Sequence, residues 1–181
     1  MDDSMKTTLS VLVENHAGVL SKVVGLFSRR GFNIDSLAVG VTEDPTISRI
    51  TIVVTGGEHT VEQIEKQLNK VIPVIKVKRL DEGRYISRML TFFKVGFGAS
   101  RRAELMKIAE LMGARIVDVS KSTLTLEFTD TAERTETLES LLRPYGIKEV
   151  VRTGSIAIEK GETVTRSHKR QRSVPGTTVE L

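Results

Sequence analysis

The stretch Glu14-Asn15-His16-Ala17-Gly18-Val19-Leu20 turns the chain from a strand into a helix. Before it, Leu9, Val11 and Val13 recur at every second position, which predicts a half-buried strand. After it, apolar residues recur at helical spacing through residues 18–30, and the glycine that follows is a typical helix stop. The chain therefore opens with a strand, a sharp turn and an amphipathic helix.

The same turn has the residue types of a site for a small zwitterion. Ala17 and Gly18 leave room for a ligand to approach the backbone, and the first helical turn offers unpaired N–H groups that favour a carboxylate. Asn15 adds an amide whose carbonyl oxygen can accept from an ammonium group. Two interpretations stay open from these residues alone: a free amino-acid site, or a strand-to-helix turn closed by an Asx cap.

Alternating periodicities predict a β-α-β-β-α-β order for the first half of the chain. The second helix is expected to carry an apolar stripe that includes Ile72 and to end at Pro73. The order is the split unit of ferredoxin-like sandwiches, whose strand order is 4-1-3-2. The predicted elements are strands at 7–14, 33–42, 50–54 and 75–80 and helices at 18–30 and 60–72.

The pattern repeats after a polar break at residues 81–84. Ser100 and Asp130 have positions suited to helix N-caps, and a hairpin lies between the two helices. The last apolar segment, 147–158, predicts one strand or a bent pair of strands. We therefore expect an α+β protein with two ferredoxin-like βαββαβ domains, at residues 5–82 and 86–160. The residues from 161 to 181 lack apolar periodicity and are expected to form a disordered basic tail.

Charge and composition narrow the function classes. The chain has 181 residues, no cysteine and a net charge of +4. Residues 160–172 hold five basic side chains against one glutamate, so this short run accounts for the whole net charge. A nucleic-acid-binding body would carry its own basic face, and none is indicated. No stretch reaches transmembrane length, so we expect a cytoplasmic protein that binds neither nucleic acid nor membrane.

Motifs of catalysis and metal binding are missing from the sequence. His16, His59 and His168 have no metal-ligand spacing, and a lone Gly-x-Gly at residues 96–98 lacks the third glycine of a phosphate loop. An acylphosphatase-like enzyme would need an arginine in the loop after the first strand, and residues 15–20 contain none. We predict no catalytic residue and no metal ligand in this chain.

Asn33 opens the predicted second strand, which lies at the edge of a 4-1-3-2 sheet. An apolar edge strand is exposed to unwanted pairing unless something covers it. The same edge of a second copy would cover it in a two-fold dimer and would bring Asn33 toward the partner's first helix. The alternative is that Asn33 is only a turn residue after Gly31.

Two stretches of the first half carry a resemblance to a known family. Residues 10–20 (SVLVENHAGVL) and 25–37 (GLFSRRGFNIDSL) closely resemble an ACT domain, and more narrowly the regulatory (small) subunit of acetohydroxyacid synthase, also called acetolactate synthase. Residues 44–49 (DPTISR) and 64–70 (IEKQLNK) fit the same family. The resemblance extends over residues 6–160, although the second half matches in length and pattern more than in motif.

This resemblance implies a non-catalytic subunit that binds and activates a larger catalytic subunit. It also implies feedback inhibition by a branched-chain amino acid, usually valine, and a homodimer formed through the ACT domain. Thiamine diphosphate, FAD and magnesium would belong to the catalytic subunit, with no cofactor in this chain. The implied effector-binding residues are Asn15, His16, Ala17, Gly18, Val19, Leu20, Asn33 and Ile34.

Other functions stay open at this point. A free-standing amino-acid-sensing regulator with two ACT-like halves would need no enzyme partner, and co-purification would separate it from a subunit. A metal- or DNA-binding regulator of ferredoxin-like build should show clustered histidines or a basic body, and the sequence shows neither.

Overall fold

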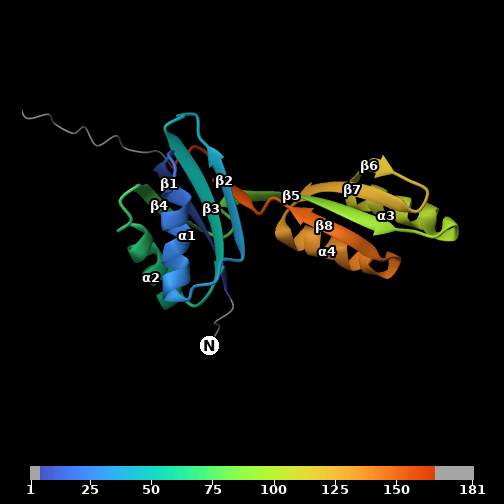
Figure 1. The fold of residues 1–181 in the computed structure, drawn as a ribbon, viewed down its shortest axis with the longest axis horizontal. Helices are drawn as coiled ribbons and strands as arrows, with labels where there is room; N and C mark the ends of the chain where they lie inside the picture. The colour runs from blue at the N-terminus through green and yellow to red at the C-terminus, as the bar shows by residue number, and fades with distance from the viewer. Residues whose placement is uncertain (1–4, 166–181) are drawn as a thin grey trace, which may run out of the picture.

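The computed structural model describes residues 5–165, which form two α/β domains side by side along the long axis of the molecule (Figure 1). Each domain has one antiparallel sheet with two α-helices, in the strand and helix order expected from the sequence. The predicted fold class, two ferredoxin-like βαββαβ domains, is therefore confirmed.

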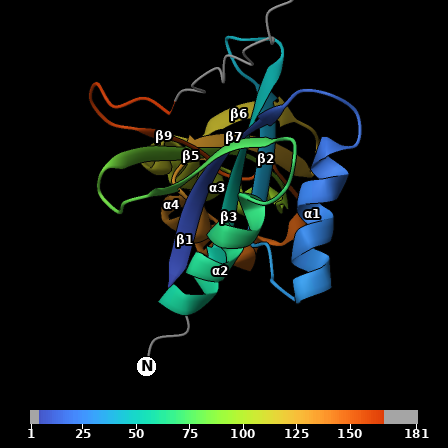
Figure 2. The same cartoon turned by 90° about the vertical axis from the view of Figure 1, so that its left-hand side faces the viewer.

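The first domain has a four-stranded sheet. Its elements are β1 Lys6–Glu14, α1 Val19–Arg30, β2 Ser36–Val41, β3 Ile47–Thr55, α2 Glu58–Leu68 and β4 Val74–Leu80. The sheet order is β2-β3-β1-β4 with every neighbouring pair antiparallel, which confirms the 4-1-3-2 order. In Figure 2, α1 and α2 lie in front of this sheet and the second domain lies behind it.

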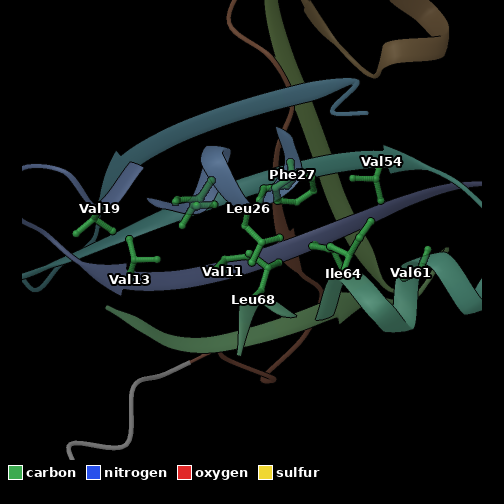
Figure 3. Close-up of a cluster of buried hydrophobic side chains, with 13 residues drawn as sticks. Val11, Val13, Val19, Leu26, Phe27, Val54, Val61, Ile64 and Leu68 are labelled. Carbon is green, nitrogen blue, oxygen red and sulfur yellow. The ribbon is translucent and has the colours of Figure 1, made fainter. Parts of the chain in front are cut away.

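Both helices bury one apolar stripe against the sheet. Leu9 and Val11 of β1 pair with Ile52 and Ile50 of β3, and all four side chains face the helices. Figure 3 shows the helix side chains, among them Phe27, pointing into the same layer. Because strand side chains alternate, the other face of the sheet carries the intervening residues and is left to the second domain.

The second domain repeats the arrangement and adds one strand. Its elements are β5 Tyr85–Gly96, η1 Ala99–Arg101, α3 Arg102–Met112, β6 Arg115–Val119, β7 Thr123–Asp130, α4 Ala132–Leu142, η2 Arg143–Tyr145, β8 Ile147–Arg152 and β9 Ile156–Glu159. The main sheet has the order β6-β7-β5-β8. The last segment is a bent pair of strands, of which β9 pairs with the beginning of the long β5.

Two elements of the first domain are shorter than the periodicity predicts. β2 begins at Ser36 instead of Asn33, because the chain leaves α1 through a left-handed Gly31 and first crosses from the helix layer to the sheet. α2 ends at Leu68, and Ile72 is 93% exposed, so its placement on the buried stripe was wrong. After Leu68 the backbone hydrogen bonds join residues three apart, Lys70 N–H to Gln67 O and Val71 N–H to Leu68 O, so the α-helical pattern ends before Ile72.

Neither predicted capping residue caps its helix. Ser100 lies within the short turn η1, ahead of α3. Thr131 caps α4, and its hydroxyl accepts a hydrogen bond from the N–H of Arg134 at 3.3 Å. β7 extends through Asp130, so the non-helical capping position falls one residue later than the sequence spacing suggests.

Side chains of β5, β9 and the segment after β9 hold the second domain against the open face of the first sheet. The Tyr85 hydroxyl lies 3.2 Å from Thr8 Oγ1, and Lys78 Nζ lies 2.6 Å from Glu159 Oε1. Thr165 is buried and its carbonyl accepts from Arg49 Nη2 at 3.2 Å. Thr165, which we expected to belong to the disordered tail, therefore contacts the first domain, and residues 166–181 lie outside the described part of the chain.

Candidate functional site

Gly18 shapes the turn on which the candidate site is built. Its φ of +84° is a left-handed conformation that side-chain-bearing residues rarely adopt, and within the described part of the chain a Cβ there would meet no atom within 4 Å. Its carbonyl accepts from Lys22 N–H at 3.1 Å, which starts the hydrogen bonding of α1. The sequence therefore needs glycine here for the backbone conformation, and the space around it is open.

The N-terminus of α1 is available to an external anion. No side chain of residues 5–165 caps the helix by a hydrogen bond, and its first turn contains no acidic residue. The N–H groups of Leu20 and Ser21 belong to that turn, where an α-helix has no carbonyl one turn earlier to pair with. These donors and the positive end of the helix dipole favour a carboxylate ligand.

Asn15 is held beside this helix end by the turn between β2 and β3. Its backbone N–H donates to Thr46 O at 2.7 Å and its side-chain Nδ2 donates to Pro45 O at 2.9 Å. Asn15 is thus not the Asx cap of the alternative interpretation. With the amide nitrogen engaged, the carbonyl oxygen is the end that can accept from an ammonium group.

The other residues of the turn differ in what they can offer a ligand. His16 lies with Nε2 3.1 Å from Glu14 Oε2 and Nδ1 3.0 Å from the carbonyl of Ala17. Val19 is 3% exposed in the core, so only its backbone can face a ligand, whereas Leu20 is 42% exposed. Val19, one of the residues that the resemblance implies for the effector site, therefore directs its side chain into the core.

Asn33 and Ile34 lie beyond the opposite end of α1. Asn33 Nδ2 donates to Asp35 Oδ1 at 2.9 Å, and the other oxygen of Asp35 accepts from the Thr55 hydroxyl at 2.6 Å. Ile34 packs against the core. The Asn33 amide is therefore oriented by a hydrogen bond from its nitrogen, as the Asn15 amide is. Residue types alone did not predict that Asp35 and Thr55 hold the Asn33 side chain in this way.

One chain does not bring the two asparagines together. Asn15 precedes α1 and Asn33 follows it, and a helix of 12 residues is about 18 Å long at 1.5 Å per residue. A small amino acid cannot contact both asparagines within one chain. The predicted residues therefore form two groups, one at each end of α1.

The edge strand β2 lies between these two groups. It pairs with β3 alone in the described part of the chain. Val39 and Val41 on β2 are 48% and 60% exposed, and Val39 pairs with the buried Ile50, which places it on the helix-covered face. An apolar edge of this kind is a surface that another strand can cover.

Within residues 5–165 no group of three or more histidine, aspartate or glutamate side chains could hold a metal ion. In the same range no helix is long and apolar enough to span a membrane.

Comparison with known proteins gives the same family for both domains. Residues 9–76 match the family described as "AHAS small subunit-like ACT domain", and residues 88–161 match "Small subunit of acetolactate synthase". The acetolactate synthase small subunit of Mycolicibacterium smegmatis is 49% identical over 154 residues, which cover 85% of this chain and 91% of that protein. The probable acetolactate synthase small subunit of Archaeoglobus fulgidus is 46% identical over 157 residues, covering 87% and 98%.

A solved structure extends the similarity to the arrangement of both domains. The crystal structure of the acetolactate synthase small subunit from Thermotoga maritima superposes with a TM-score of 0.81 at 36% identity, covering 88% of this chain and 99% of that one. The sequence matches and the structural match cover similar shares of this chain, 85–88%. The chain therefore belongs to the family of acetolactate synthase small subunits, with an ACT domain in its first half.

Proposed function

We propose that this chain is the non-catalytic regulatory subunit of an acetolactate synthase, which activates the catalytic subunit and makes it sensitive to a branched-chain amino acid. The observation that carries the proposal is the uncapped N-terminus of α1 beside the oriented amide of Asn15. A carboxylate on the N–H groups and an ammonium group on the Asn15 carbonyl match an α-amino acid. The exposed Leu20 suits an apolar side chain, and valine is the effector we expect.

The effector site is proposed to form between two chains. In a two-fold dimer with β2 antiparallel to the partner's β2, the beginning of one strand lies beside the end of the other. Asn15 is bonded to Pro45 and Thr46, just beyond the end of β2, and Asn33 lies three residues before its beginning. The pairing thus supports a site with Asn15 from one chain and Asn33 from its partner, and it covers Val39 and Val41.

Thiamine diphosphate, FAD and magnesium belong to the catalytic subunit in this proposal, and the whole assembly is expected in the cytoplasm. The chain would act by binding, so its effect on the reaction depends on contact with that partner. A free-standing amino-acid sensor is the alternative, and it would bind the effector without such contact.

Titration calorimetry with L-valine, L-leucine and L-isoleucine, followed by a rate assay, tests this function. The assay measures acetolactate formation by the catalytic subunit of the same organism, with and without this chain. The chain should raise the rate, and valine should lower it only when the chain is present. An unchanged rate and unchanged valine sensitivity would contradict the regulatory role, and effector binding without association would favour the free-standing sensor.

A further inference from the structure

The turn between β8 and β9 reaches from the second domain to the beginning of β2. The N–H of Ser155 donates to the Ser36 hydroxyl at 2.8 Å, and Ser155 is buried. Figure 1 shows this orange segment leaving β8 and passing toward β2. Ser36 is the first residue of β2, so the contact lies where that strand starts.

Gly154 allows the two backbones to approach at this point. A Cβ at position 154 would lie 2.7 Å from the carbonyl oxygen of Leu37 and 3.1 Å from its carbonyl carbon. These are backbone atoms of a paired strand and cannot move aside as a flexible side chain can. The φ of Gly154 is +82°, which also favours glycine.

The turn is anchored firmly in the second domain. Thr153 N–H donates to Leu90 O at 3.1 Å, and Leu90 N–H donates back to Thr153 Oγ1 at the same distance. Leu90 is part of β5, the central strand of that sheet. Two hydrogen bonds therefore tie the beginning of the turn to the second sheet.

On the side of the first domain, the contact is next to the Asn33 group. Ser36 directly follows Asp35, whose carboxylate accepts from Asn33 and from Thr55. The backbone N–H of Asp35 donates to Val53 O at 2.9 Å. Ser36 is therefore the point where the loop that carries Asn33 joins the sheet.

We propose that the β8–β9 turn, Thr153 to Ser155, positions the Asn33 segment of the effector site, so that the second domain sets effector affinity and responds to its occupancy. The effect on effector affinity rests on the proposed function. The positioning of residues 33–38 by the turn does not depend on it. Coupling between two sites is reciprocal: if the turn changes the affinity for the effector, the effector must stabilise the turn.

Gly154→Ala and Gly161→Ala form a matched pair for testing the positioning. Gly161 also has a left-handed φ, +72°, but a Cβ there meets no atom of the described residues within 4 Å. Both variants place alanine at a left-handed φ, and only Gly154→Ala drives a methyl group into the backbone of Leu37. Without ligand, hydrogen exchange at residues 33–38 should become at least about threefold faster in Gly154→Ala and stay unchanged in Gly161→Ala. Equal exchange in the two variants would overturn the positioning role.

Ser36→Ala gives a second, gentler variant, because it removes only the hydroxyl that accepts from Ser155. Ser140→Ala is its control, since the Ser140 hydroxyl bonds Glu136 O within α4. L-Valine, L-leucine and L-isoleucine are titrated into the full chain. The affinity for the effector should fall at least about fivefold in Gly154→Ala and Ser36→Ala. It should stay within about twofold of wild type in the controls Gly161→Ala and Ser140→Ala. Bound effector should also slow exchange at residues 153–155 of the wild type.

The outcomes separate the two proposals. Faster exchange at residues 33–38 with unchanged effector affinity would overturn the link between the second domain and the effector site. If the wild type binds none of the three amino acids, the proposed function fails, and the ligand-free exchange comparison still decides whether the turn positions residues 33–38.

Discussion

Asn15 and Asn33 are each oriented by a hydrogen bond from the amide nitrogen, to Pro45 O in one case and to Asp35 Oδ1 in the other. This leaves both carbonyl oxygens as acceptors, which is what a ligand ammonium group needs. The chemistry of Asn15 was predictable from its residue type and its place before a helix. The partners that fix the amides were not. Pro45 lies beside Asn15 only because β1 pairs with β3, up to Glu14 and Ile47. Asp35 is held in place by its contacts with Val53 and Thr55 of β3.

Gly18→Asp should abolish effector binding, because its carboxylate would occupy the helix end that the ligand carboxylate should meet. Gly18→Asn is the matched control: the side chain has the same size and the same tolerance for the left-handed φ, without the charge. We expect Gly18→Asp to lose at least about tenfold more valine affinity than Gly18→Asn, measured by calorimetry on folded protein. Equal affinities in the two variants would contradict a carboxylate at this position.

Periodicity predicted the elements well because each helix and strand buries one face. The alternation of Leu9 and Val11 and the stripe that contains Phe27 all lie in the first core. The ends of elements were less predictable, since they depend on tertiary pairing. Asp130 has the residue type of a cap but belongs to a strand that is extended by pairing with Met89. Local spacing carries no information about that pairing.

The cap of α4 gives a test at the scale of one element. Thr131→Ala should lower the free energy of unfolding by about 1 kcal/mol, because the N–H of Arg134 loses its acceptor. Thr137→Ala is the control, since Thr137 is exposed within the same helix and its hydroxyl only bonds the carbonyl of Glu133. Denaturant unfolding measures both variants. An equal loss in the two variants would show that the Thr131 hydroxyl is not a cap.

The arrangement of the two domains depends on contacts between the open face of the first sheet and the strands β5 and β9. No local sequence pattern predicts these contacts. Lys78 and Glu159 form one such contact, and their side chains are partly buried, with 31% and 16% of their surfaces exposed. The hydrogen bond from Lys78 holds the pKa of Glu159 below its ordinary value, against the effect of burial, which raises it. The Thr165 hydroxyl donates to the same carboxylate and adds to the lowering of the pKa.

Acid should therefore weaken the domain contact in a predictable direction. Since the folded pKa of Glu159 lies below its unfolded value of about 4.5, the charged carboxylate contributes stability above that pH, and the contribution is lost as pH falls through the folded pKa. Between pH 7 and pH 3, Glu159→Gln should lose less unfolding free energy than the wild type. Glu149→Gln, which alters the exposed pair with Lys94, should keep the wild-type profile. Identical profiles for Glu159→Gln and the wild type would refute this role.

The central claim is that the effector site is shared, with Asn15 from one chain and Asn33 from its partner. In this proposal each contact would be a hydrogen bond to a charged ligand group, worth roughly 1.5–3 kcal/mol, so the loss of either should weaken binding at least about tenfold. In a mixed dimer of an Asn15→Ala chain and an Asn33→Ala chain, a shared arrangement puts both defects in one site and leaves the other site intact.

Calorimetric titration of the isolated mixed dimer with L-valine is the most direct measurement of this arrangement. Homodimers of either variant serve as controls, because both of their sites carry one defect in any arrangement. The shared site predicts one binding event per mixed dimer at wild-type affinity, which neither homodimer shows. A mixed dimer without any wild-type site would contradict it, since sites built within one chain would all carry a defect.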